Sequence, residues 1–110
     1  MTIKSLKLSI IIPVRNEENS LFELCEEFNN LFFNNYNDFE IIFVNDNSSD
    51  NTENIINKFI NETNYIKIYN LKKHSGQSEC IDFGIKNSVY DLIATIDGDG
   101  QNPPSEILKL

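Results

Sequence analysis

The sequence has 110 residues, of which 40% are hydrophobic and 24% charged, and this balance predicts one soluble globular domain. Seventeen acidic against nine basic residues give a formal net charge of -8, which disfavours binding to nucleic acid. No apolar run approaches the roughly 18 residues of a membrane helix, and the N-terminus lacks a cleavage site for a secretion signal. Cys25 and Cys80 form no metal-binding motif, so reduced thiols and a cytoplasmic location are expected.

Four short segments rich in β-branched residues predict strands, and segments with helical spacing of apolar residues separate them. The strands are expected at residues 7–12, 39–44, 65–69 and 91–96, and the helices at about 21–32, 50–60 and 78–85, with a fourth from Ser105. This β-α alternation indicates an α/β fold with a mostly parallel, doubly wound, Rossmann-like sheet and flanking helices. Because the sequence ends soon after Ser105, we expect an N-terminal part of a longer protein or a truncated form of it.

The boundaries of these elements follow from turn and capping residues. Pro13 is expected to end the first strand, because proline lacks a backbone donor. Asn19 or Ser20 is expected to cap the first helix, and Ser49 or Asp50 the second. Cys25, Cys80 and Phe28 are expected in the core.

Ligands bind at the carboxyl edge of such a sheet, so the loops that follow the strands are the candidate site. The four loops are polar and comprise residues 13–18, 45–50, 72–77 and 97–101. All of them except 72–77 contain acidic residues. Asp97-Gly98-Asp99 places two carboxylates around one glycine at a strand end, which favours a hard cation such as Mg²⁺ or Mn²⁺. An ordinary Asp-Gly turn would have the same sequence.

The other loops offer weaker signals. Asp46 is expected to accept hydrogen bonds from a base or ribose, since its neighbours suffice to cap the following helix. Glu17 either faces the same cleft or is a solvated charge near a helix N-terminus. Gly76-Gln77 resembles a weak anion-binding loop, whereas Lys72 to His74 predict a solvated basic turn in which His74 binds no ligand.

Taken in order, four blocks resemble the N-terminal half of a family 2 glycosyltransferase with the GT-A fold, truncated after its Asp-x-Asp motif. The blocks are Ser9 to Glu18, Phe43 to Asp50, His74 to Gln77 and Asp97 to Pro104, and together they span nearly the whole chain. The last block is similar to the Asp-x-Asp-x-Gln-x-Pro-Pro form of polyisoprenyl-phosphate glycosyltransferases such as dolichol-phosphate mannose synthase. One nucleotide-sugar-binding part, residues 1–110, is therefore expected, without the acceptor half.

The resemblance implies a role for each matching residue. Those implied to bind the nucleotide sugar are Pro13, Arg15, Glu17, Asp46, Gly76, Gln77, Asp97 and Gly98, and those implied to hold Mg²⁺ or Mn²⁺ are Asp97, Asp99 and Gln101. Glu17 would lie near the ribose and Asp46 would hold the base. The sequence departs from the family pattern at Asn45, Arg15 and Lys73-His74, which leaves the identity of the base open.

The resemblance also implies a reaction. A sugar would pass with inversion from a nucleoside-diphosphate sugar to a polyprenyl phosphate at the cytoplasmic face of the membrane, with a divalent metal stabilising the leaving diphosphate. The family places the catalytic base downstream of residue 110, so the chain is expected to bind donor without catalysing transfer. The sugar, the acceptor and the oligomeric state stay open.

Two alternatives remain. One is a family 2 transferase that acts directly on a cell-surface glycan. The other is a receiver-like regulatory domain, which also gathers carboxylates around Mg²⁺ at the ends of parallel strands. That domain expects paired acids after the first strand and an aspartate after the third, whereas Pro13 and Asn70-Leu71 stand at those places here.

Overall fold

The computed structural model describes residues 7–35 and 38–96, with side chains for 7–30 and 39–96. Strands and helices alternate along the chain as the sequence predicted. The elements are β1 (Lys7–Val14), α1 (Glu18–Asn35), β2 (Asp38–Asn45), α2 (Thr52–Glu62), β3 (Ile66–Asn70), α3 (Gln77–Lys86) and β4 (Leu92–Thr95). The predicted fourth helix lies outside the described residues, as do Asp97, Gly98, Asp99 and Gln101.

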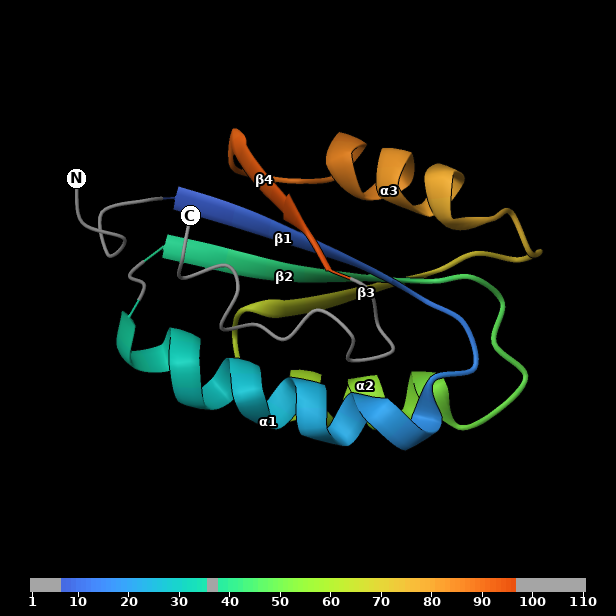
Figure 1. Ribbon diagram of the computed structural model, residues 1–110, viewed down its shortest axis with the longest axis horizontal. Coiled ribbons are helices and arrows are strands. Elements are labelled where there is room, and N and C mark those ends of the chain that lie inside the picture. Colours follow the sequence, from blue (N-terminus) through green and yellow to red (C-terminus); the bar gives the residue numbers. More distant parts are fainter. Residues whose placement is uncertain (1–6, 36–37, 97–110) are drawn as a thin grey trace.

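The four strands form one parallel sheet in the order β3-β2-β1-β4. Its register aligns a row of apolar residues across the sheet, in which Ile10 pairs with Ile41 and Ala94, and Ile41 pairs with Ile66. Helices α1 and α2 cover one face, and α3 covers the other (Figure 1). The predicted parallel, doubly wound arrangement is therefore confirmed.

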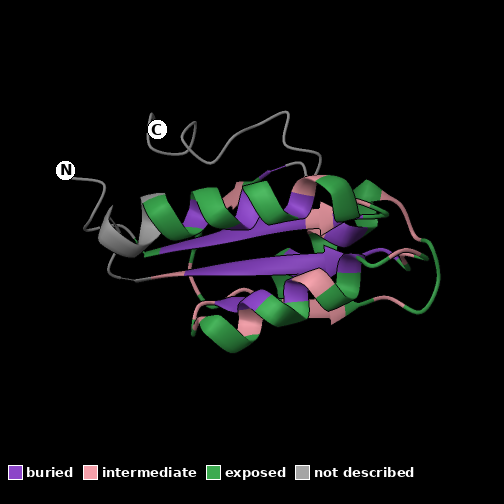
Figure 2. Cartoon of the chain, turned by 90° about the horizontal axis from the view of Figure 1, so that it is seen from below, coloured by how far each residue is buried: buried purple, intermediate pink, exposed green. Residues whose placement is uncertain are grey.

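Both faces of the two central strands are buried, as Figure 2 shows in purple. The larger core lies under α1 and α2 and includes Ile10, Ile12 and Phe43, while the smaller core under α3 includes Ile11 and Ile42. Side chains alternate between the faces of a strand, so a strand covered on both sides needs a continuous apolar run. Cys25, Cys80 and Phe28 are buried as expected.

Helix α3 packs very closely on β1 at one point. A methyl group on Gly84 would lie 2.5 Å from Cγ2 of Ile11, whose side chain is fully buried. Only a residue without a side chain allows this approach, because such a separation is well inside van der Waals contact.

The predicted boundaries of α1 and β1 were wrong. Helix α1 begins at Glu18, and the N–H groups of Ser20 and Leu21 donate to the carbonyl of Glu17, so neither Asn19 nor Ser20 caps the helix. Strand β1 continues through Pro13, which pairs with Val44. Pro13 is tolerated because it lies beyond Ile11, the last residue of β1 that pairs with β4.

The N-cap of α2 is Asn51, and not Ser49 or Asp50 as predicted. The Asp50 carboxylate still bonds the first residue of the helix, accepting the N–H of Thr52 at 3.0 Å and its hydroxyl at 2.5 Å. It therefore satisfies a donor at the helix start from one position further out.

A buried acid anchors the α3–β4 connection at the amino edge of the sheet. Glu40 Oε2 accepts the hydroxyl of Ser9 at 2.7 Å and the N–H of Val89 at 2.6 Å, while its Oε1 lies 2.7 Å from Lys67 Nζ. Burial disfavours ionisation of Glu40, but the bond from Lys67 and those from Ser9 and Val89 outweigh it and hold its pKa below the usual value.

None of the helices in the described part of the chain combines the length and the apolar character that a membrane span requires.

Candidate functional site

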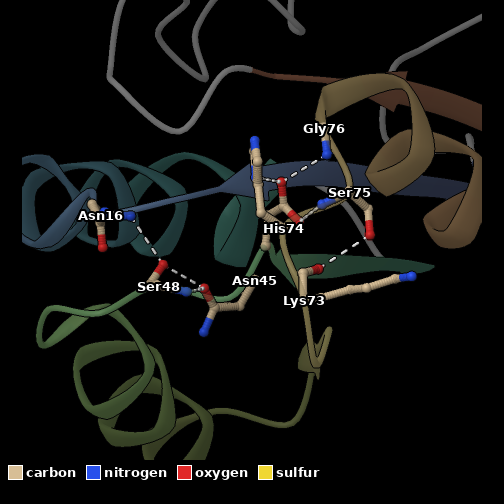
Figure 3. A network of polar contacts seen from close by, with 8 residues as sticks. Asn16, Asn45, Ser48, Lys73, His74, Ser75 and Gly76 are labelled. Atoms are coloured by element: carbon tan, nitrogen blue, oxygen red, sulfur yellow. Dashed lines mark hydrogen bonds and ion pairs between the residues drawn. The ribbon is translucent and has the colours of Figure 1, made fainter.

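The first two loops at the carboxyl edge are joined through Asn16, which directly follows the exposed Arg15. The N–H of Asn16 donates to Ser48 Oγ at 2.9 Å (Figure 3). The side-chain oxygen of Asn16 accepts the N–H of Ser49 at 2.8 Å. Asn16 has a φ of 54°, in the left-handed region that asparagine tolerates better than most residues. The turn after β1 therefore holds the β2–α2 loop in place.

Asn45, at the end of β2, uses both halves of its amide. Its oxygen accepts the hydroxyl of Ser48 at 2.5 Å, and its nitrogen donates to the side-chain oxygen of Asn70 at 2.8 Å. A carboxylate has acceptors only and could not donate to Asn70 in this way. Asparagine at this departure from the family pattern thus links the ends of β2 and β3.

Asp46 is a buried acid at this edge, and only 4% of its surface is exposed. Its Oδ1 accepts the N–H of Ser75 at 2.7 Å, and its Oδ2 accepts the N–H of Gly76 at 2.9 Å. Nδ1 of His74 lies 2.6 Å from the same Oδ2. Burial opposes ionisation, but the two backbone bonds and the contact with His74 outweigh it and keep the pKa of Asp46 below its usual value.

These contacts shape the start of α3. Gly76 is the N-cap of the helix and has a φ of 93°, a conformation that side chains disfavour. Asp46 places a negative charge beside the donors of this helix end, where the helix dipole stabilises it. The buried thiol of Cys80 lies nearby, and burial followed by the charge of Asp46 raises the pKa of Cys80 to about 11.

The structure brings six of the predicted site residues to one edge of the sheet, on the loops after β1 and β2 and at the start of α3. They are Pro13, Arg15, Glu17, Asp46, Gly76 and Gln77. Arg15 and Gln77 are exposed, and Glu17 is half-buried with its Oε2 3.2 Å from Ser20 Oγ. Sequence reasoning placed the loops of Asn16 and His74 at this edge but gave neither residue a role in the site.

The predicted metal residues Asp97, Asp99 and Gln101 lie outside the described part of the chain. Within the described part, no group of three histidine, cysteine, aspartate or glutamate side chains could hold a metal ion. The last described residue, Ile96, is buried, and its N–H donates to the carbonyl of Ile11 at 3.1 Å. In the sequence, Asp97-Gly98-Asp99 directly follows Ile96, which lies at the carboxyl edge of the sheet.

A surface groove of about 390 Å³ lies at the opposite edge of the sheet. It is lined by Asn29, Asn61, Glu62, Thr63, Asn64 and Tyr65. The hydroxyl of Tyr65 donates to Asn29 within it at 3.2 Å. Because these residues flank the amino end of β3, the groove is separate from the candidate site.

The sequence is similar to that of a bacterial transferase. Over 105 residues the chain is 38% identical to an undecaprenyl-phosphate 4-deoxy-4-formamido-L-arabinose transferase of Proteus mirabilis. The match covers 94% of this chain and 32% of the relative. The chain therefore spans about a third of the length of that protein.

Solved structures share the fold. TarS residues 1–349 of S. aureus in complex with UDP-GlcNAc has a TM-score of 0.74 and 28% identity, over 86% of this chain and 27% of TarS. The mannosyltransferase PcManGT of Pyrobaculum calidifontis, in complex with GDP-Man and Mn²⁺, has a TM-score of 0.78 over 90% of this chain and 30% of that protein. Its identity is 13%, so this likeness concerns the fold alone.

The parallel sheet with helices on both faces is thus that of GT-A glycosyltransferases, as the resemblance implied. The family model described as glycosyl transferase family 2 matches residues 9–110. Since this match covers nearly the whole chain, the chain belongs to glycosyl transferase family 2.

Proposed function

We propose that the chain is the donor-binding part of an enzyme that transfers a sugar from a nucleoside-diphosphate sugar to a polyprenyl phosphate. The observation that carries this proposal is the 38% identity to a transferase named for undecaprenyl phosphate, over 94% of the chain. A protein of this kind would work at the cytoplasmic face of the membrane, where its lipid acceptor is anchored. Family membership leaves no reason to retain the receiver-like alternative.

The nucleotide would lie across the loops at the carboxyl edge, with Pro13, Arg15 and Glu17 on one side and Gly76 and Gln77 on the other. The base would donate a hydrogen bond to Asp46. Oδ1 of Asp46 takes the N–H of Ser75 and the thiol of Cys80 is also hydrogen-bonded to this carboxylate, so the base would displace the thiol, which is a weak donor. The hydrogen bonds of Asn16 and Asn45 hold these loops in place before ligand arrives.

Asp97, Asp99 and Gln101 would hold Mg²⁺ or Mn²⁺, with Gly98 allowing close approach of the backbone to the ligand. Oxygen ligands suit both ions. Asp97 directly follows Ile96, which lies at the edge where the other loops meet. The metal, when bound, neutralises the negative charge that develops on the leaving diphosphate. The chain has a net charge of -8, so the metal would add to the compensation that the basic residues at this edge provide for a diphosphate.

Transfer with inversion requires the acceptor to approach the sugar from the face opposite the diphosphate. An acceptor phosphate is already anionic near neutral pH, so its deprotonation demands less of a catalytic base than a hydroxyl acceptor would. We place that base outside this chain, which would then bind the donor without turning it over.

The test is a thermal-shift and calorimetric screen of nucleoside diphosphates and their sugars, with Mg²⁺, with Mn²⁺ and with a chelator. We expect measurable binding only when the divalent ion is present. Asp99→Asn should weaken this binding, because it removes a proposed metal ligand. Asp82→Asn, an exposed change on α3, is the charge-matched control. Equal affinity in the chelator would contradict the metal assignment, and no binding of any nucleotide under any condition would contradict donor binding itself.

A further inference from the structure

The loop after β3 concentrates basic residues in an acidic chain. Lys72, Lys73 and His74 are consecutive and exposed, although the whole chain carries a net charge of -8. They lie between the end of β3 and the start of α3, at the edge where the candidate site residues meet. A polyanion that approaches this edge would be attracted by the lysines of this loop.

His74 differs from the two lysines because a buried acid fixes it. Its Nδ1 lies 2.6 Å from Oδ2 of Asp46, and its side chain is 55% exposed whereas that of Asp46 is 5% exposed. A carboxylate is an acceptor, so the proton of this contact lies on Nδ1. The second ring nitrogen, Nε2, points away from the contact (Figure 3).

Asp46, which contacts the His74 ring, is itself held in place by hydrogen bonds. Asp46 is held by the N–H groups of Ser75 and Gly76, at 2.7 and 2.9 Å, and both residues directly follow His74 in the chain. The same carboxylate therefore fixes the ring and the backbone next to it. A side chain ordered before ligand arrives loses less conformational entropy on binding than a flexible lysine does.

We propose that His74 binds a phosphate oxygen of the nucleoside diphosphate through Nε2, with Asp46 as the residue that positions the ring. This inference rests on the proposed function, because it assumes that a nucleotide occupies the edge. The base contact and the phosphate contact would then use different atoms, Oδ1 of Asp46 and Nε2 of His74. The contact requires a ring that carries a proton on each nitrogen, so that it donates to Asp46 and to a phosphate at once.

A carboxylate-supported histidine is also the usual form of a histidine that binds a metal. In the described part of the chain, however, His74 has no second and third ligand with which to complete such a site. The neighbouring charges, Lys72 and Lys73, would also repel a cation and attract an anion. The observations therefore favour a phosphate.

The experiment uses the fact that His74 is the only histidine, so its ring gives a single set of imidazole NMR signals in isotopically labelled protein. The ligands are UDP and GDP with Mg²⁺, pyrophosphate with Mg²⁺, the nucleosides uridine and guanosine, and Mg²⁺ alone. We expect saturable shifts of the ring signals with pyrophosphate and with at least one nucleotide. Shifts of equal size with nucleosides, or with Mg²⁺ alone, would overturn the phosphate contact.

Calorimetry of two variants gives an independent measure. His74→Gln removes the imidazole and should weaken nucleotide binding by about tenfold or more, as expected for the loss of a charge-assisted hydrogen bond to a phosphate. Lys58→Gln removes one positive charge from an exposed position of α2 and should change affinity less than about twofold, since exposed charges contribute little.

The outcomes separate this inference from the proposed function. Tight nucleotide binding with unmoved His74 signals, or equal affinities of the two variants, would overturn the role of His74 and leave donor binding intact. A wild-type chain that binds neither nucleotide nor pyrophosphate would overturn both. If His74→Gln fails to fold, the wild-type NMR titration still decides the question.

Discussion

Replacing Asp46 by asparagine should lower the free energy of unfolding substantially, because the carboxylate joins the β2 and β3 loops from a buried position. It accepts two backbone N–H groups and the imidazole of His74 at 2.6 to 2.9 Å. Hydrogen bonds to a charged group contribute about 1.5–3 kcal/mol each, and they are not additive. Asparagine keeps one acceptor and turns an amide donor toward the others, so we expect a loss of about 3 kcal/mol.

The pH dependence identifies the cause of this loss. Because the pKa of Asp46 is lowered in the folded protein, its contribution is fully present above the unfolded value of about 3.9 and disappears as pH falls through the folded value. Urea unfolding followed by circular dichroism, from pH 7 down toward pH 3, should show wild type and Asp46→Asn converging in acid. Asp82→Asn, at an exposed pair 2.9 Å from Lys86, should cost less than about 0.5 kcal/mol. A loss for Asp46→Asn as small as this control, or one that persists unchanged at pH 3, would refute the reasoning.

Two further stability changes follow from the packing, and urea unfolding measures both. Glu40→Gln should cost about 2 kcal/mol at pH 7, and the difference should fade in acid because the pKa of Glu40 is also lowered; equal loss at all pH values would contradict this. Gly84→Ala should destabilise despite a gain of about 1 kcal/mol in helix propensity, because its methyl group would overlap buried Ile11. At Gly76 the methyl group of an alanine would meet no atom within 4 Å, so only the strain of a φ of 93° would oppose the change. Gly76→Ala should therefore lower the free energy of unfolding less than Gly84→Ala does.

The order and type of the elements could be predicted because hydrophobic burial determines them directly. A continuous run such as residues 41–44 is buried on both faces, and a stretch with apolar residues three and four apart is buried on one face. The parallel sheet then follows from the helix that joins each pair of strands. These patterns depend on side chains that are adjacent in the sequence, and no long-range contact is needed to recognise them.

Helix starts could not be predicted in the same way. Serine, asparagine and aspartate occur at several neighbouring positions before α1 and α2, and each of them is a good cap. The start of α1 is decided instead by the turn at Asn16, whose side chain is bound to the N–H of Ser49, 33 residues away. A local pattern holds no information about such a bond.

The same limitation explains why the contacts of Asp46 were not predicted, although Asp46 and Gly76 were both assigned to the site. Two of these partners are backbone N–H groups of Ser75 and Gly76, and the sequence of those residues does not indicate where their backbone donors point. His74 alone looked like a solvated basic residue, since a histidine in a turn gives no sign of a carboxylate 28 positions earlier. Only the register of β2 and β3, which pairs Asn45 with Asn70, brings these loops together.

Asn45 and Asp46 are neighbours at the end of β2, and their side chains bond to different parts of the chain. Because successive side chains point to opposite faces, Asn45 bonds toward Asn70 while Asp46 bonds toward the start of α3. A second carboxylate at residue 45 would lie next to a buried charge and would lose the donor to Asn70. The neutral amide leaves one buried negative charge at this point of the edge, balanced by two N–H groups and His74. That balance permits a buried acid to stay ionised beside the proposed position of a diphosphate, with the other side of the imidazole exposed at the same edge.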